Sequence, residues 1–497
     1  MDFLDPKKQH RHKIMLIMGY ILIACVVAGT TTILLYEAYG FGLGKGGNII
    51  QNGLIYLSSQ PNPATVYLNN SKSKNSTDTA LTLPEGIYNV MLTRSGYRTW
   101  TRQVEVDGGM IENYTYPLLI PNVLQTSSVK SYSSQPQLAT QSLNRRWLVV
   151  MQPGSDTNFD LYDLSNPSLA PTQIAIPAGV VTQPTTSESW KLVAWANDNQ
   201  HVLLNHLYDG KNEYIMLDIA NPSQSFNLSK DLSGVPYTLV TLDNENYSQY
   251  YLYDQSTDTL YQDSLSSPTT PTTILSGVLA YDTYGTNTVL YATNDKASSG
   301  KVYINELVGT TVYHIKLLDT GTTYLLNMAS YSGSLYVVAG AASENKVYIF
   351  DNPVGQLQAD PDQAPVPVQV LFVNNPNYVS FSINAQFVVA ENGQNFAVYN
   401  LENSSGYNYS VNLPLDSPQV NATWMDGYRL TYVSSGKLIL FEYDHNYQQT
   451  LMPASSNFTP FFTPSYDYVY SLTTGPNQTY SLTRTSLYTS ADQPQKL

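Results

Sequence analysis

The sequence is poor in cysteine and in charged residues, and both shortages narrow the class of protein. Cys25 is the single cysteine among 497 residues, so no disulfide can form within the chain. A eukaryotic secreted domain of this size would more often contain disulfides, so the composition favours a bacterial surface protein. Only 12% of the residues are charged, which is about half the usual share. Few segments are rich in Ala, Glu and Lys, which argues against long soluble helices.

Positive charge is scarce outside the N-terminus. The formal net charge is −14, and the first thirteen residues carry +2, so the remainder carries −16. This balance argues against a nucleic-acid partner, because a protein needs clustered Lys and Arg to displace the counterions of a nucleic acid. The acidic balance itself indicates solubility and identifies no partner.

Recognised catalytic motifs are missing as well. The chain has no G-x-S-x-G, no P-loop and no H-E-x-x-H. Gly42, Gly44 and Gly47 match G-x-G-x-x-G, but a dinucleotide site needs a strand before it and a helix after it. Here the motif follows the long uncharged segment Ile14–Tyr36, which is typical of a membrane helix. We therefore predict no enzyme, no catalytic, cofactor-binding or metal-binding residue, and no cofactor. A carbohydrate-active hydrolase with two converging carboxylates is kept as the alternative.

The sequence contains two weak metal-binding patterns, one for zinc and one for calcium. Four histidines follow residue 36: His201, His206, His314 and His445. Only His201 and His206 are close in the sequence. A zinc site needs three or four converging ligands, so this spacing argues against one. The segment Asp156–Asp160 begins like a calcium loop, but Leu161 replaces the required glycine and Pro167 replaces the final glutamate.

One long uncharged segment runs from Ile14 to Tyr36, between Lys13 and Glu37. About 20 apolar residues cross a bilayer, and the basic residues before the segment predict a cytoplasmic N-terminus and an external C-terminal part. A cleaved signal peptide is the first alternative, although no A-x-A site follows. A lipoprotein signal is the second, because Leu22-Ile23-Ala24-Cys25 resembles a lipobox, but the apolar run continues beyond it.

The residues that are abundant indicate β-structure. The chain has 41 tyrosines and many Ser, Thr and Asn. Tyr and Thr favour strands, whereas Asn, Ser and Gly favour turns. We therefore predict an all-β protein after the membrane helix.

Residues 53–119 contain short alternating runs between turn signals, which predicts a small antiparallel sandwich. These residues resemble the PEGA domain family. The resemblance lies in Gly53, the turn from Ser58 to Val66, the hairpin Pro84–Tyr88 and the turn Gly96-Tyr97. The chain departs from the family where Asn62-Pro63-Ala64 replaces the tetrad that names it, and where Asn69-Asn70 replaces an Asp-Gly turn. The resemblance implies a non-enzymatic extracytoplasmic β-sandwich and supplies no ligand.

The rest of the chain repeats a hairpin unit about every 45 residues. Each hairpin pairs two aromatic and aliphatic strands around a polar turn, and eight are present: Trp147–Val150 with Phe159–Tyr162, His201–Leu204 with Tyr214–Leu217, Tyr250–Tyr253 with Leu260–Tyr261, Val289–Ala292 with Val302–Ile304, Leu335–Val338 with Val347–Phe350, Phe387–Ala390 with Phe396–Tyr399, Arg429–Tyr432 with Leu438–Phe441, and Tyr468–Ser471 with Tyr480–Leu482.

This period is typical of β-propeller blades, which have four strands each. We predict a seven- or eight-bladed β-propeller, with two stacked β-sandwiches as the alternative. The array resembles Trp-Asp, quinoprotein and TolB-like propellers in general shape but lacks the Gly-His and Trp-Asp signatures.

The predicted protein is a single-pass plasma-membrane protein that presents its propeller outside the cell to a protein, cell-wall or glycan partner. The alternatives are a carbohydrate-active hydrolase and a component of an envelope assembly complex. The predicted order is residues 1–13 as a cytoplasmic basic tail, 14–36 as the transmembrane helix through which it meets the membrane, 37–52 as a Gly-rich linker, 53–119 as the PEGA-like β-domain, 120–134 as a linker, 135–490 as the propeller and 491–497 as a C-terminal tail.

Overall fold

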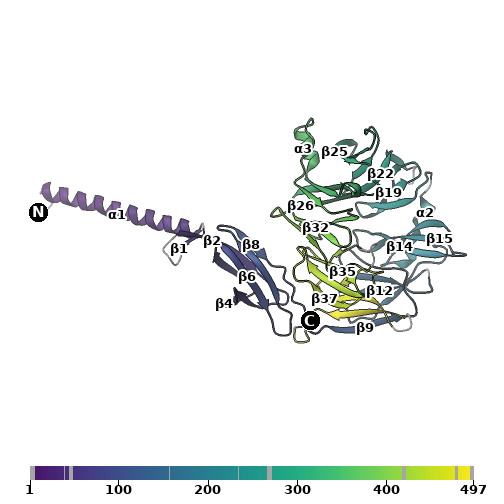
Figure 1. Ribbon diagram of the computed structural model, residues 1–497, viewed down its shortest axis with the longest axis horizontal. Helices are drawn as coiled ribbons and strands as arrows, with labels where there is room; N and C mark the ends of the chain where they lie inside the picture. The colour runs from purple at the N-terminus through teal and green to yellow at the C-terminus, as the bar shows by residue number, and fades with distance from the viewer. Residues whose placement is uncertain are drawn as a thin grey trace. The chain divides into compact units, whose positions relative to one another are not determined.

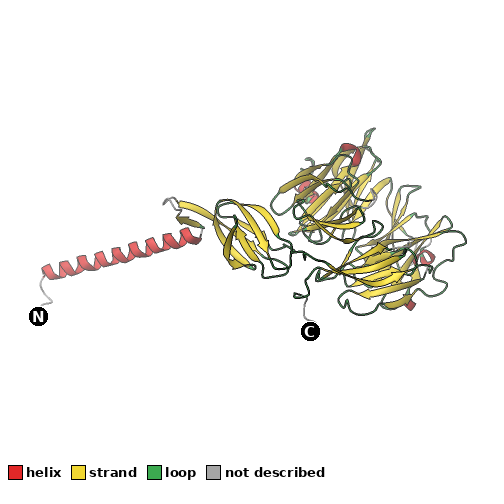
Figure 2. Ribbon diagram, turned by 60° about the horizontal axis from the view of Figure 1, so that its bottom comes forward, coloured by secondary structure: helices red, strands yellow, loops and turns green. Residues whose placement is uncertain are grey.

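The computed structural model describes residues 6–38, 40–43, 49–155, 157–232, 234–265, 271–416, 421–475 and 479–492. The chain divides into two compact units. The first extends to Val123 and includes C-terminal residues around Asp492, and the second extends from Leu124 to Thr489. Figures 1 and 2 show one long helix followed by parts made almost wholly of strands.

The N-terminal helix α1 spans Pro6–Ala38 and is longer than the predicted membrane segment. Within it, Gln9–Glu37 is long and apolar enough to cross a membrane, with a mean hydropathy of 2.2, and none of that window is buried against protein. The hydroxyl groups of Thr30 and Thr32 donate to backbone carbonyls one turn earlier, at 2.7 and 2.8 Å. These bonds satisfy the polar side chains inside an otherwise apolar helix.

The small β-domain consists of two sheets. The first holds β1 (Phe41–Leu43), β2 (Ile49–Leu57), β5 (Thr79–Pro84) and β8 (Ile111–Tyr114), and the second has the order β4 (Ser71–Ser76), β3 (Thr65–Leu68), β6 (Gly86–Thr93) and β7 (Trp100–Val106). The prediction of a purely antiparallel sandwich was wrong in one respect, because β8 pairs with β2 in parallel. Strand β1 also lies within the predicted linker 37–52, of which residue 39 and residues 44–48 lie outside the described residues.

Two glycines of the small β-domain are required by geometry. A Cβ atom on Gly53 would lie 2.4 Å from the Asp107 carbonyl oxygen and 2.6 Å from Val106 Cγ1, so a side chain does not fit. Gly96 has a φ of +85°, which side chains rarely tolerate. The backbone therefore requires glycine at both positions, the first residue of the PEGA-like pattern and its Gly-Tyr turn.

The second unit contains eight antiparallel four-stranded sheets among the described residues. Each is a meander, here called a blade, and its strands follow in chain order except in the last blade. Blades 1 to 4 are β10 (Ala139–Gln141), β11 (Trp147–Met151), β12 (Asn158–Asp163), β13 (Thr172–Ala175); β14 (Glu188–Trp195), β15 (His201–Tyr208), β16 (Lys211–Asp218), β17 (Phe226–Asn227); β18 (Leu239–Asp243), β19 (Asn246–Asp254), β20 (Thr259–Ser264), β21 (Thr272–Leu275); and β22 (Val278–Thr283), β23 (Thr288–Thr293), β24 (Lys301–Val308), β25 (Thr311–Asp319).

Blades 5 to 8 complete the unit. They are β26 (Tyr324–Tyr331), β27 (Ser334–Ala341), β28 (Lys346–Asp351), β29 (Gln369–Phe372); β30 (Tyr378–Phe381), β31 (Phe387–Glu391), β32 (Asn395–Asn400), β33 (Ser405–Ser410); β34 (Thr423–Trp424), β35 (Arg429–Ser434), β36 (Lys437–Glu442), β37 (Gln449–Pro453); and β38 (Phe461–Phe462), β39 (Tyr468–Thr474), β40 (Tyr480–Ser486) with β9 (Gln125–Tyr132). Short helices α2 (Leu228–Asp231) and α3 (Pro353–Ala359) lie in connections, as do the 3₁₀ turns η1 (Pro222–Gln224) and η2 (Ala342–Glu344).

All eight predicted hairpins are present, each as the second and third strands of one blade. The first strands of neighbouring blades contact one another, as β14 does β18, and β26 does both β22 and β30. First strands therefore lie innermost, which is the arrangement of a β-propeller.

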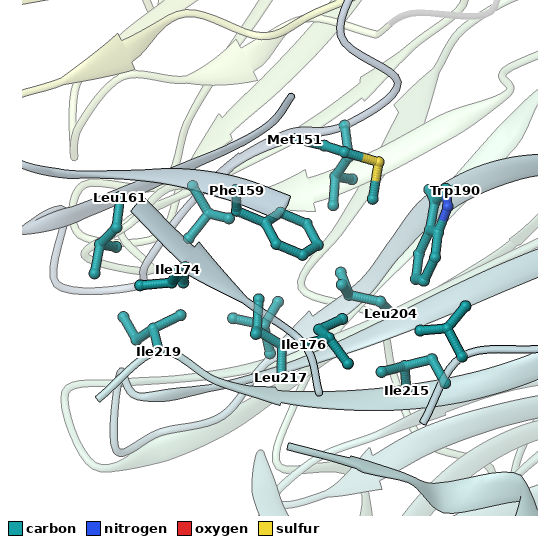
Figure 3. Close-up of a cluster of buried hydrophobic side chains, with 14 of the residues drawn as sticks. Met151, Phe159, Leu161, Ile174, Ile176, Trp190, Leu204, Ile215, Leu217 and Ile219 are labelled. Carbon is teal, nitrogen blue, oxygen red and sulfur yellow. The ribbon is translucent and has the colours of Figure 1, made fainter. Parts of the chain in front are cut away.

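Apolar clusters fill the interfaces between blades. Figure 3 shows the one between blades 1 and 2, where Met151, Phe159 and Ile174 meet Trp190, Leu204 and Ile215. Similar clusters join blades 2 and 3, 3 and 4, 4 and 5, and 5 and 6. Between blades 6 and 7 the rings of Phe396 and Phe441 pack edge to face at 5.8 Å.

The ring is closed by a strand from the N-terminal side of the propeller. Strand β9 pairs antiparallel with β40 from Tyr480↔Tyr132 to Ser486↔Gln125 and becomes the outer strand of blade 8. Figure 1 shows β9, in blue, beside the yellow C-terminal strands. This segment lies in the predicted linker 120–134, so the structure places a closing strand where a linker was expected.

Asp160 ties this closing strand to blade 1. Its carboxylate is fully buried and accepts hydrogen bonds from Lys130 Nζ at 2.8 Å, the Tyr132 hydroxyl at 2.9 Å and Gln152 Nε2 at 2.8 Å. Burial and the nearby Tyr162 and Asp160 raise the pKa of Tyr132 well above 10, so its hydroxyl stays protonated and can donate. Asp160 therefore joins β9 to β12 through two donors, Lys130 and Tyr132, while Gln152 binds it from within blade 1.

We expect Asp160→Ala to lower the free energy of unfolding by about 2–3 kcal/mol, because it leaves buried donors without an acceptor. Asp163→Ala is the matched control on the same strand, since its pair with Arg146 is about half exposed on the arginine side. The control should cost about 1 kcal/mol or less. Urea unfolding of the full chain, followed by tryptophan fluorescence, measures both; equal losses would contradict a special role for Asp160.

Candidate functional site

One end of the propeller carries the turns between the first and second strands of each blade. Because every blade is an antiparallel meander, these turns and the connections between third and fourth strands lie at the same end of each sheet. We call this end the AB face. The opposite end carries the turns between second and third strands and the linkers from one blade to the next.

A similar turn recurs on the AB face. Its first residue accepts a backbone N–H from the start of the second strand: Ser142 from Trp147 at 2.9 Å, Ser382 from Phe387 at 3.0 Å and Thr463 from Tyr468 at 3.1 Å. The fourth residue has a positive φ, at Arg145, Asn199, Ala385 and Tyr466. This turn was not predicted from the sequence, although three blades contain its pattern of Ser or Thr followed two residues later by Asn or Ser.

Neighbouring AB turns are joined by hydrogen bonds. The Asn144 N–H donates to Asn199 Oδ1 at 2.8 Å, which joins blades 1 and 2. The Asn197 N–H donates to the Glu245 carbonyl at 2.8 Å, which joins blades 2 and 3. Arg145 of blade 1 donates to the Met425 carbonyl of blade 7, and its guanidinium lies 4.8 Å from the Tyr466 ring centroid of blade 8. The AB face is thus a cross-linked surface rather than a set of separate loops.

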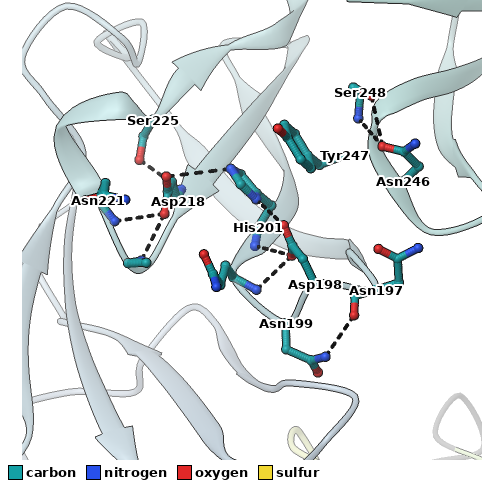
Figure 4. Close-up of polar contacts among 12 residues, drawn as sticks. Asn197, Asp198, Asn199, His201, Asp218, Asn221, Ser225, Asn246, Tyr247 and Ser248 are labelled. Carbon is teal, nitrogen blue, oxygen red and sulfur yellow. Dashed lines mark hydrogen bonds and ion pairs between the residues drawn. The ribbon is translucent and has the colours of Figure 1, made fainter.

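The two histidines of β15 lie at opposite ends of that strand, and each sits between two carboxylates. His201 is on the AB face, with Nδ1 2.6 Å from Asp198 and Nε2 3.6 Å from Asp218 (Figure 4). The Tyr247 ring of blade 3 stacks on this imidazole at 3.9 Å and 9°. This stack was not predicted from the sequence.

His206 is fully buried towards the other end of the propeller. Its Nδ1 lies 3.0 Å from Glu213, its Nε2 lies 3.4 Å from Glu188, and the Trp190 ring stacks on it at 4.3 Å. Burial alone would raise the pKa of Glu213, but hydrogen bonds from His206, Thr182 and Asn227 lower it to about 2. Since Thr182 belongs to the linker between blades 1 and 2, this cluster fixes that linker.

The other residues considered for metal binding are placed apart. His314 lies 2.8 Å from Asn305, and His445 lies 2.8 Å from Gln448. Asp156, the first residue of the calcium-like pattern, lies outside the described residues, and Asp160 is engaged by Lys130. Within the described part of the chain, no three His, Cys, Asp or Glu side chains are grouped to hold a metal ion.

Several carboxyl groups are buried within single blades. Burial raises the pKa of Glu306 to about 7, and it raises that of Glu391 to about 8 despite backbone hydrogen bonds from Ala422 and Gly393. Glu306 lies on β24 in blade 4 and Glu391 on β31 in blade 6, and neither is more than 1% exposed. Placed in different blades and shielded from solvent, they do not make the paired, accessible carboxylates that a glycosidase needs.

These two groups predict that stability falls as the pH rises. An unfolded glutamate titrates near 4.5, so between about pH 4.5 and pH 7 to 8 the folded protein binds more protons than the unfolded chain. Each group then costs about 1.4 kcal/mol of unfolding free energy per pH unit in that window. We expect thermal unfolding of the full chain to give a higher Tm at pH 5 than at pH 8.

Glu306→Gln and Glu391→Gln should each flatten this dependence, because an amide does not titrate. Glu85→Gln, at an exposed position of the small β-domain, is the control and should leave the slope unchanged. A Tm that rises from pH 5 to pH 8, or slopes that are the same in all variants, would contradict the assignment.

Comparison with known proteins confirms the resemblance of the small β-domain. Residues 52–119 match the model of the PEGA domain. No curated protein matches the chain.

Solved structures give only distant likeness. Hsv2p of Kluyveromyces lactis is 10% identical, with 65% of this chain and 99% of that one covered and a TM-score of 0.37. An oligogalacturonate lyase in complex with manganese is 8% identical, with 74% and 98% covered and a TM-score of 0.39. An uncharacterized protein from Listeria monocytogenes is 10% identical, with 65% and 91% covered and a TM-score of 0.38.

Proposed function

We propose that this protein is a membrane-anchored extracytoplasmic binding or scaffolding protein of the bacterial cell surface. In this proposal α1 spans the plasma membrane with its N-terminus in the cytoplasm, the PEGA-like domain is a spacer, and the propeller presents its AB face to a protein or cell-wall partner. The observation that carries the proposal is the AB face itself. Many residues of its turns are exposed, and several neighbouring turns are hydrogen-bonded to one another, as at Asn144 and Asn197.

A rigid polar surface suits binding because little side-chain entropy is lost when a partner docks. Catalysis is a weaker reading, since Glu306 and Glu391, the carboxyl groups with the highest pKa values, are enclosed in separate blades. A component of an envelope assembly complex would also bind partners through this face. Its partners would be other proteins of that complex, which co-purification from membranes would recover.

Site-specific cross-linking tests the proposed binding face. A photo-reactive amino acid at Thr286, an exposed residue in the AB turn of blade 4, should cross-link to envelope components in intact cells. Ser298 is the matched control, because it is exposed in the same blade but lies in the connection at the opposite end. We expect adducts from Thr286 and few from Ser298. Equal adducts from both, or none from either, would reject an envelope partner that docks at the AB turn of blade 4.

The orientation is tested by labelling with a membrane-impermeant maleimide in a Cys25→Ser background. Ser298→Cys should react in intact cells, whereas His10→Cys should react only after lysis. Reaction of His10→Cys in intact cells would reverse the proposed topology.

Mass spectrometry of the native N-terminus separates the two kinds of anchor. A chain that begins at Met1 or Asp2 keeps the spanning helix, whereas a chain that begins at an acylated Cys25 is a lipoprotein.

A further inference from the structure

The His201 imidazole is held at both of its nitrogen atoms. Asp198, which contacts Nδ1 at 2.6 Å, also accepts the backbone N–H groups of Gln200 and His201. Asp218, near Nε2, is fixed by the N–H groups of Ala220 and Asn221 at 2.9 and 2.8 Å. Figure 4 shows the imidazole between these two carboxylates. The ring therefore has one orientation.

Tyr247 is ordered in turn by this imidazole. Its ring lies 3.9 Å from the His201 ring and is nearly parallel to it, yet the residue is 38% exposed. The imidazole covers one face of the phenol, which leaves the other face and the edge for a ligand. A large aromatic ring is thus presented to solvent in a fixed position at the junction of blades 2 and 3.

Neutral hydrogen-bonding groups stand in the adjoining turns. Asn197 and Asn244 are both exposed, and the Asn197 amide donates to the Asn244 carbonyl at 3.2 Å. The next AB turn, in blade 4, adds the exposed Tyr284 and Thr286. The nearby charges are acidic, on Asp198 and Glu245, which disfavours a phosphate, sulfate or uronate ligand.

A flat ring with amides beside it suits the apolar face and the hydroxyl edge of a sugar ring. The aromatic surface takes the C–H face of a pyranose, and amides can both donate to and accept from hydroxyl groups. Fixed aromatic groups bind with little loss of side-chain entropy. We propose that Tyr247, with Asn197 and Asn244, forms a binding site for a neutral carbohydrate. This proposal rests on the proposed binding role of the AB face and names its ligand class.

The test uses the full-length chain in lipid nanodiscs, because sugar-headed detergents would compete for the site. Calorimetric titration with hexasaccharides of α-linked glucose, β-linked glucose and β-linked N-acetylglucosamine should give saturable binding for at least one of them. Tyr247→Ala should weaken that binding about tenfold, which is the upper range for a single aromatic contact. Tyr247→Phe keeps the ring and should change it about twofold or less.

Tyr56→Ala is the matched control, since Tyr56 is 43% exposed but lies in the small β-domain. It should bind as the wild type does, and far-UV circular dichroism establishes that all variants are folded. Binding that is unchanged in Tyr247→Ala would overturn the site. No binding of any of the three hexasaccharides at millimolar concentration would overturn the carbohydrate class.

The two proposals fail in different ways. If Thr286 still cross-links to a protein in cells while no hexasaccharide binds, the AB face is a binding surface for a protein and the carbohydrate site is rejected. If Thr286 gives no adduct but a hexasaccharide binds at Tyr247, the sugar site stands and the envelope partner is rejected.

Discussion

The antiparallel ladder between β9 and β40 is the constraint on which the propeller depends. It joins residues about 350 positions apart, as between Ser131 and Ser481. Closing a loop of that length costs about 5 kcal/mol of chain entropy. The ladder offsets this cost together with the apolar cluster between blades 8 and 1, where Tyr132 and Leu148 meet Phe461 and Leu482. Without closure, blades 1 and 8 would each expose a face that is now buried.

Closure also determines the geometry of the AB face. The contact from Arg145 in blade 1 to Met425 in blade 7 passes across blade 8, and it exists only because the two ends of the array are brought together. The bonds from Asn144 to Asn199 and from Asn197 to Glu245 continue the same surface through blades 2 and 3. The AB turns are therefore held in place by the closed ring, and the sequence of a single turn does not determine its position.

The strands that sequence reasoning found are those with the strongest burial. The second and third strands of most blades are largely buried, so β11 and β31 read as nearly continuous apolar runs. The outer strand β21 is short and none of its residues is buried, so its sequence carries little signal. Strand β9, with its Ser, Thr and Lys residues, is exposed over half its length, and its partner lies at the far end of the chain. No local sequence pattern predicts such a strand.

The candidate site was beyond sequence reasoning for a related reason. Tyr247 was one of 41 tyrosines, and only its stacking on His201, a residue of the neighbouring blade, distinguishes it. The histidine pair of β15 was noticed in the sequence, but the carboxylates that fix each ring come from other strands and turns, such as Asp218 at the end of β16. Pairing across strands is what a one-dimensional pattern does not contain.

Few residues of this protein are charged, and the fold uses several of them in its interior. Asp160 binds the closing strand, and Glu213 binds the linker between blades 1 and 2. Arg429, at the start of β35, pairs with Asp426 in the AB turn before it. Such buried charges need several partners each, because a charge removed from water is costly unless it is paired. The exposed turn residues beside Tyr247 include the uncharged Asn197, Asn244 and Thr286. A surface of this kind attracts ligands through shape and neutral hydrogen bonds, so its affinity should depend only weakly on ionic strength.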